Sequence, residues 1–112
     1  MKLPYSVANK IYIGQIIRSA SSAASNYRAA CRGKSKSDFI YKLKIVNEEL
    51  DETLFFYEML AEFNSSFQPE LREMSKECNE LLSIIVTSIN TVSKKIQDSK
   101  NQNSSIKINL KS

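Results

Sequence analysis

Hydrophobic and small residues recur every three or four positions in three segments of the chain, which is the spacing of one face of a helix. The first segment runs from Val7 to about Arg32. Its apolar face consists of Ile13, Ile16/Ile17, Ala20, Ala23/Ala24, Tyr27 and Ala30/Cys31. Many of these side chains are small, so another helix could approach closely. Gly33, just beyond the last apolar position, predicts the end of this helix.

The second helix has the clearest start signal. Ser35 stands three residues before Asp38, which is a variant of the capping box that begins many helices. The residues that follow repeat with the 3.5-residue spacing of a helix–helix contact, and the segment is expected to run to about Phe63. The repeating positions are Phe39, Leu43, Val46, Leu50, Thr53/Leu54, Tyr57 and Leu60.

The third helix is predicted to open at Pro69, because proline suits a first helical position. Its apolar positions are Leu71, Met74, Cys78, Leu81/Leu82, Ile85, Ile89, Val92 and Ile96. Ile84 and Val86 widen this face, so we expect the helix to contact more than one neighbour. From Asp98 the composition changes to Asn, Gln, Ser and Lys. Residues 1–97 are therefore expected to form one helical domain and 98–112 a polar, disordered tail.

Helices of this length, joined by short loops, pack as antiparallel neighbours. The chain has only two Gly and two Pro, which argues against a many-stranded sheet. The sequence therefore predicts an all-α protein, an antiparallel up-and-down helical bundle with three long helices and a flexible C-terminal tail.

Charge is distributed unevenly, although the net charge is only +4. Residues 1–44 hold nine basic side chains against one carboxylate, a net +8, and residues 45–80 hold two against ten, a net −8. Residues 81–112 carry a net +4. This asymmetry indicates either a basic surface for a polyanion or oppositely charged faces that dock on each other. Both readings stay open.

The residue inventory argues against catalysis. The chain has no His, no Gly-rich phosphate loop and no cysteine pair at metal-binding spacing. The acidic run 48–52 lacks the His that di-metal bundle sites use, so a solvated or docking face is expected there. Cys31 and Cys78 lie on apolar faces and are expected to be buried, reduced thiols. We expect no enzymatic activity, no cofactor and no metal.

No signal peptide or membrane span is recognisable, which favours a soluble cytoplasmic protein.

The candidate nucleic-acid-binding residues are basic side chains of the first helix and the loop after it. They are Arg18, Arg28, Arg32, Lys34 and Lys36. Arg28 and Arg32 share one helix face, and Tyr27 or Tyr41 could stack on a base. The arginines could instead pair with carboxylates of the second helix, which is the slightly favoured interpretation for Arg18. The loop lysines favour the binding interpretation.

Two polar residues lie close to the small-residue face of the first helix. Ser22 and Asn26 could belong to a site, but buried polar groups of this kind more often fix the register between helices. They are therefore interpreted as structural polar residues.

Three stretches of the chain carry a family resemblance: Gln15 to Ala20, Ser25 to Arg32 and Ser35 to Leu43, above all the run Asn-Tyr-Arg-Ala-Ala-Cys-Arg. They resemble the bacterial four-helix-bundle family encoded by intervening sequences of 23S ribosomal RNA. The resemblance continues in Glu48 to Thr53 and Glu77 to Leu81 and spans about residues 3–97. It implies an all-α bundle without known enzymatic activity. Relatives include the accessory protein of diversity-generating retroelements, a homopentamer that binds nucleic acid and reverse transcriptase.

One departure from the family concerns the start of the chain. Family members carry a helix before the Leu-Pro that is here Leu3-Pro4. The expectation is a late start codon, a truncated copy, or a neighbouring subunit that replaces this helix. Without it, a long apolar groove between the remaining helices would be exposed, and such grooves self-associate or bind a partner helix.

Together these features predict a non-enzymatic, self-associating helical protein that binds structured RNA rather than DNA through its basic face, and the resemblance implies a pentamer. The alternative is a protein–protein scaffold whose charged faces serve assembly, with no binding of nucleic acid.

Overall fold

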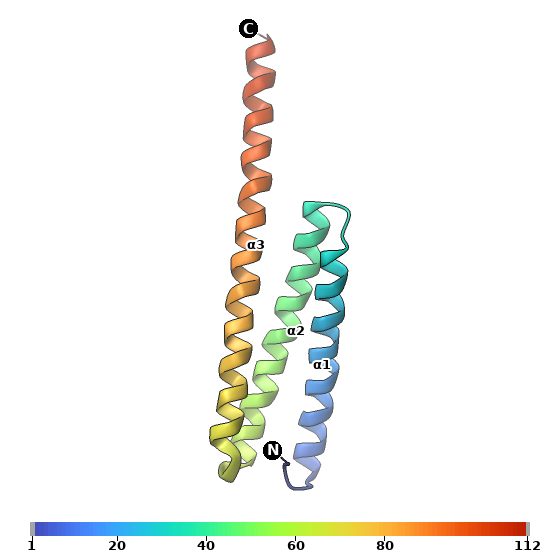
Figure 1. Ribbon diagram of the computed structural model, residues 1–112, viewed down its shortest axis with the longest axis vertical. Helices are drawn as coiled ribbons and strands as arrows, with labels where there is room; N and C mark the ends of the chain where they lie inside the picture. Colours follow the sequence, from blue (N-terminus) through green and yellow to red (C-terminus); the bar gives the residue numbers. More distant parts are fainter. Residues whose placement is uncertain (1, 112) are drawn as a thin grey trace.

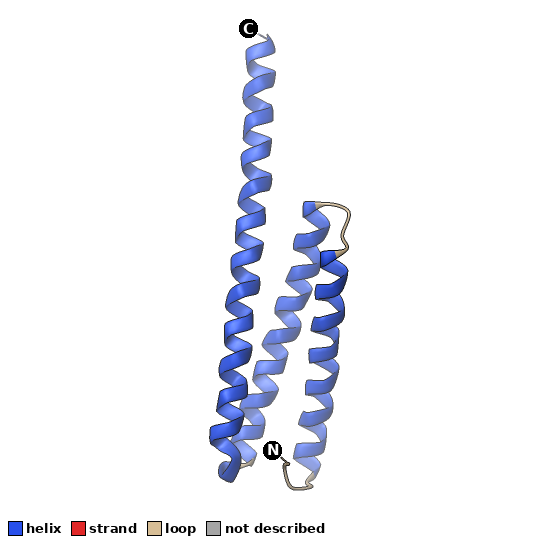
Figure 2. Ribbon diagram, in the orientation of Figure 1, coloured by secondary structure: helices blue, strands red, loops and turns tan. Residues whose placement is uncertain are grey.

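The computed structural model describes the backbone of residues 2–111 and the side chains of residues 2–103. Three α-helices account for most of the chain: α1 (Val7–Cys31), α2 (Lys36–Phe63) and α3 (Gln68–Lys111), with a short 3₁₀ turn, η1 (Ser65–Phe67), before α3. Figure 2 shows no strand among the described residues. The prediction of an all-α protein with three long helices is confirmed.

The helix boundaries follow the capping signals of the sequence. Ser35 is the N-cap of α2, and its hydroxyl accepts a hydrogen bond from the backbone N–H of Asp38 at 3.1 Å. At the start of α1, Ser6 caps the helix in the same way by accepting from the N–H of Asn9 at 3.0 Å. The predicted starts and ends of α1 and α2 agree with the structure to within one residue.

The end of α3 differs from the expected one. The sequence predicts a third helix to about Ile96, whereas α3 runs to Lys111. The disordered tail expected over 98–112 stays a prediction. In Figure 1 this segment projects well beyond the ends of α1 and α2. No Gly or Pro follows Pro69, so nothing in the sequence breaks the helix. The polar composition of this segment fits its position outside the packed part of the molecule.

The central helix is α2, which packs against both other helices (Figure 1). No Cα atom of α1 lies within 8 Å of a Cα atom of α3 over the described backbone. One buried cluster joins all three helices through Ala23, Leu43, Val46 and Ile85. A second cluster lies at the other end, where Leu60 and Ala61 of α2 contact Leu71 of α3. The predicted apolar face of α2 is thus the centre of the core.

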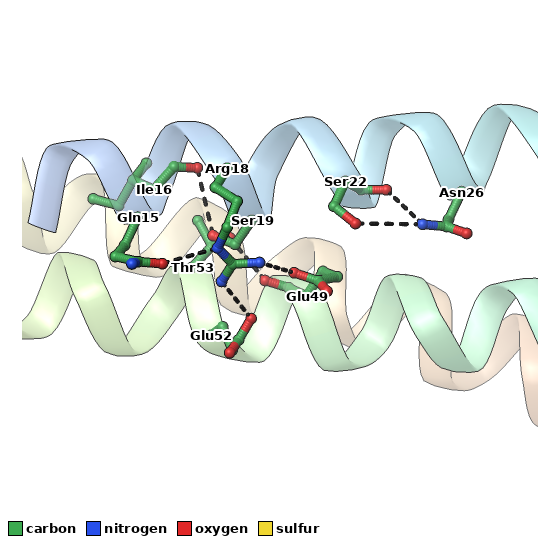
Figure 3. Close-up of polar contacts among 9 residues, drawn as sticks. All are labelled: Gln15, Ile16, Arg18, Ser19, Ser22, Asn26, Glu49, Glu52 and Thr53. Atoms are coloured by element: carbon green, nitrogen blue, oxygen red, sulfur yellow. Dashed lines mark hydrogen bonds and ion pairs between the residues drawn. The ribbon is translucent and has the colours of Figure 1, made fainter.

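Two buried polar contacts fix α1 against α2. The side-chain amides of Asn9 and Asn64 exchange two hydrogen bonds of 2.8 and 2.7 Å, and each also donates to a backbone carbonyl. Further along, the hydroxyl oxygens of Ser19 and Thr53 lie 2.6 Å apart, and Thr53 donates to the carbonyl of Glu49 (Figure 3). Each of these buried polar groups has a hydrogen-bond partner. Their burial therefore does not lower the free energy of unfolding in the way that an unpaired buried group would.

The apolar face of α1 divides into two rows. Tyr12, Ile16, Ala23 and Ala30 pack toward the core. The other row, hereafter the α1 apolar row, is exposed and contains Ile13, Ile17, Ala20, Ala24, Tyr27 and Cys31. Its spacing alternates between four and three residues, which is the repeat of a helix–helix contact. An apolar groove of about 470 Å³ lies beside this row, between α1 and α3.

The two cysteines differ in their surroundings. Cys78 is buried, and its thiol lies 3.2 Å from the carbonyl oxygen of Leu50, as expected for a packed thiol. Cys31 is exposed, so its predicted burial is wrong: it belongs to the α1 apolar row, which no other element covers in the described chain.

This difference predicts the reactivity of the thiols. Burial raises the pKa of the Cys78 thiol, which lowers the fraction of reactive thiolate at neutral pH. In the unassembled chain we expect a disulfide reagent to label Cys31 rapidly and to label Cys78 only after unfolding. Mass spectrometry of the native and urea-unfolded chain checks this. Equal labelling rates in the native state would contradict the burial of Cys78.

Candidate nucleic-acid interface

Arg18 is held in an ion-pair network on the surface between α1 and α2. Its guanidinium donates to Glu52 at 2.8 Å, to Glu49 at 3.3 Å and to the amide oxygen of Gln15 at 2.8 Å, as Figure 3 shows. This is the intramolecular pairing that was slightly favoured for Arg18. Two carboxylates therefore offset its charge, and its donors are largely occupied.

The network shifts the ionisation of its members. The hydrogen bond from Arg18 lowers the pKa of Glu52, and the same bond raises the pKa of Arg18. A carboxylate with a lowered pKa in the folded state stabilises the fold at neutral pH, and this contribution is lost as the pH falls through that pKa. Both side chains are exposed, so solvent screens the effect.

The pH dependence of Glu52→Gln follows from this shift. The variant is expected to be less stable than the wild type at neutral pH, and the difference should vanish in acid, once Glu52 is protonated. Urea denaturation at both pH values measures it. Glu48→Gln is the matched control, because Glu48 is exposed and forms no ion pair with the described side chains. A difference that grows in acid would contradict the ion pair.

Arg28 and Arg32 lie at the C-terminal end of α1, and both are exposed. Neither forms an ion pair with any side chain of residues 2–103. Their position has a structural benefit as well, because cations interact favourably with the carbonyl end of a helix. Unlike Arg18, however, they present free guanidinium groups to solvent. Five donors in a planar fork suit the phosphate oxygens of a polynucleotide.

The loop between α1 and α2 adds Lys34 and Lys36, which are also exposed. Gly33 follows the C-cap of α1, Arg32, with a φ that is not positive. A Cβ at this glycine would lie 2.6 Å from a carboxylate oxygen of Asp38 and 3.1 Å from the carbonyl oxygen of Ala30. The close neighbours of this position, rather than a left-handed backbone, favour glycine here, although the Asp38 carboxylate is the end of a flexible side chain that can move. The four cations Arg28, Arg32, Lys34 and Lys36 are hereafter the basic end.

A cleft of about 480 Å³ opens beside this loop, and α3 forms part of its wall. Lys34 and Lys36 line it together with Lys95 of α3. Ala30, Phe39 and Val92 supply apolar lining. Sequence reasoning missed Lys95 because it stands 59 residues after Lys36. The only available signal was its place three residues after Val92 on the predicted contact face of α3.

The remaining candidates have local roles. The side-chain amide of Asn26 donates to the carbonyl and hydroxyl of Ser22 at 2.9 and 3.4 Å, so these bonds stay within α1 (Figure 3). The polar contacts between α1 and α2 are made by Asn9 and Ser19 instead. Tyr27 lines the apolar groove, whereas the ammonium of Lys42 lies 5.8 Å from the ring centre of the exposed Tyr41.

Two further classes of site receive no support. Among the described residues, no three His, Cys, Asp or Glu side chains come close enough to hold a metal ion. Over the same part of the chain, none of the helices combines the length and apolarity that crossing a membrane requires.

Comparison with known protein families gives one match over most of the chain. The model of the 23S rRNA-intervening sequence protein family matches residues 2–87. The chain belongs to this family. No curated protein and no solved structure matches it. The matched span contains α1, α2 and the first part of α3, and it includes the whole basic end. In this member of the 23S rRNA-intervening sequence family, Val92 and Lys95 of the α3 wall of the cleft lie beyond the matched residues.

Proposed function

We propose that this protein binds structured RNA in the cytoplasm through its basic end and has no enzymatic activity. The observation that carries the proposal is the contrast between the arginines of α1: Arg18 is neutralised by two carboxylates, whereas Arg28 and Arg32 are free. Unpaired cations gathered at one end of an elongated molecule are the electrostatic footprint of a phosphate-binding surface. The family name, which refers to 23S rRNA, supports RNA over DNA.

Salt-titrated binding to a hairpin RNA tests this function. If the basic end neutralises four phosphates, the logarithm of the affinity should fall with the logarithm of salt concentration with a slope of about −3. Arg28→Gln should weaken binding and make the slope shallower. Arg18→Gln is the internal control, because the native carboxylates already offset that charge. An affinity that ignores salt, or equal losses for the two variants, would contradict the proposal.

A second candidate function, a self-assembling scaffold, is favoured by the α1 apolar row. Ile17 is 62% exposed and Tyr27 50%, and both face water in a single chain. An exposed apolar repeat of this length is typical of an interaction surface. We infer that a second copy of the chain covers it and completes an up-and-down bundle with α1, α2 and α3.

Charge favours a second copy over an unrelated partner. The basic end lies at the α1–α2 junction, and the opposite end carries six exposed carboxylates in α2 and α3 (Figure 1). They are Glu58, Glu62, Glu70, Glu73, Glu77 and Glu80. Two copies packed in opposite directions would place each basic end on the other's acidic end, so the chain is complementary to itself.

Light scattering during size-exclusion chromatography tests this assembly. Ile17→Glu should yield a monomer, because assembly through the α1 apolar row would have to bury an unpaired carboxylate in an apolar contact. Ile11→Glu is the matched control: Ile11 is 55% exposed on α1 but lies outside the α1 apolar row. A wild-type mass of two subunits would support this antiparallel pair, whereas the five subunits that the resemblance implies would contradict it. A wild-type monomer, or equal masses for the wild type and the Ile17 variant, would exclude this surface.

A further inference from the structure

We propose that the cleft between the α1–α2 loop and α3 holds one unpaired nucleotide of an RNA strand. Lys34, Lys36 and Lys95 would contact its phosphates, and the base would lie against the apolar lining. This inference rests on the proposed RNA binding and names the part of the RNA that is recognised. It predicts a protein that prefers loops and single strands to continuous duplex.

The charges around the cleft support a phosphate ligand. Its three cations come from two places in the fold, the loop with the start of α2 and the distant α3, and converge on one opening. No Asp or Glu is among its lining residues. A cleft of about 680 Å³ between α2 and α3 differs in this respect, because Glu58 and Glu62 line it together with Arg72 and Lys76. Mixed charges of that kind do not select an anion.

The second argument is the apolar lining. Ala30, Phe39 and Val92 come from α1, α2 and α3, so all three helices contribute. Phe39 is half-buried and packs against the core cluster, which holds its ring in place. A nucleobase offers a flat apolar face that stacks on an aromatic ring, but only when the base is not stacked in a helix. Cations and an aromatic side chain that line the same cleft therefore fit an unpaired nucleotide better than a free phosphate.

The size of the cleft agrees with this ligand. A volume of about 480 Å³ lies within the range of sites that hold small organic molecules, roughly 300–1,000 Å³. The bases of a duplex cannot stack on Phe39, because their faces are covered by neighbouring base pairs. The proposed preference for unpaired RNA thus follows from the shape and chemistry of the cleft together.

The test compares Lys95→Gln with Lys94→Gln on the full chain. Both lysines are exposed on α3, but only Lys95 lines the cleft, so the variants share net charge and differ in position. Fluorescence anisotropy measures binding of a labelled oligouridylate of about ten nucleotides and of a labelled RNA duplex of the same length. Circular dichroism verifies that both variants remain helical.

We expect Lys95→Gln to weaken oligouridylate binding about tenfold, the size of one charge-assisted contact, and Lys94→Gln to weaken it roughly twofold or less. The wild type should bind the oligouridylate more tightly than the duplex. If the wild type binds RNA but the two variants lose affinity equally, or the duplex binds as well, the cleft proposal is wrong and RNA binding by the basic end stands. If the wild type binds neither RNA at low salt, both proposals fail.

Discussion

Leu43→Ala is expected to lower the free energy of unfolding by about 2–5 kcal/mol. Leu43 is completely buried on α2 and contacts a cluster that joins all three helices. Truncation removes apolar contacts and leaves a cavity, because neighbours on three separate helices cannot all collapse into the space. Urea denaturation followed by circular dichroism measures the loss.

Ile11→Ala is the matched control for this substitution. Ile11 is an aliphatic residue of similar size but is 55% exposed on α1. Its truncation should change the free energy of unfolding by about 0.5 kcal/mol or less. Similar losses for Leu43 and Ile11 would mean that α2 is not the centre of the core.

The double variant Arg28→Glu with Arg32→Glu is expected to weaken RNA binding about a hundredfold or more at low salt. Each substitution replaces an attraction to phosphate with a repulsion at the same point of the surface. Both arginines are exposed and form no ion pair with the described side chains, so the fold should be retained. Anisotropy titrations with a hairpin RNA measure the change.

The control for this variant is Lys2→Glu with Lys10→Glu, which changes the net charge by the same amount at the opposite end of α1. It should weaken RNA binding far less if position matters and not only total charge. Loss of self-association in the Arg28/Arg32 variant, with a wild type that retains no RNA, would favour the scaffold. Equal effects of the two double variants on RNA would mean that only the overall charge attracts RNA.

The local structure of this protein could be predicted from sequence because its signals act over a few residues. Ser35 and Asp38 set the start of α2 through one hydrogen bond between residues three apart. The apolar spacing identified Leu43 and Leu71 as core positions, and both are completely buried. The end of α3 escaped prediction because polar residues without Gly or Pro are compatible with either a helix or a tail.

The candidate site was predictable only in part. Arg28 and Arg32 were proposed from their helical spacing, and both are exposed in the structure; their role in binding stays a prediction. Spacing alone could not decide the partner of Arg18, since Glu49 and Glu52 are more than thirty residues away. The register between α1 and α2 brings these groups together, and the buried contact of Ser19 with Thr53 is one of the contacts that fix it.

The sequence by itself determined the all-α class, the bounds of α1 and α2 and the uneven distribution of charge, because each depends on residues that are neighbours along the chain. Only the tertiary structure decided which cations remain free, which apolar row of α1 is left uncovered, and that Lys95 joins Lys34 and Lys36 around one cleft. These properties depend on the rotation and register of one helix against another, which many side chains fix together and no single segment encodes.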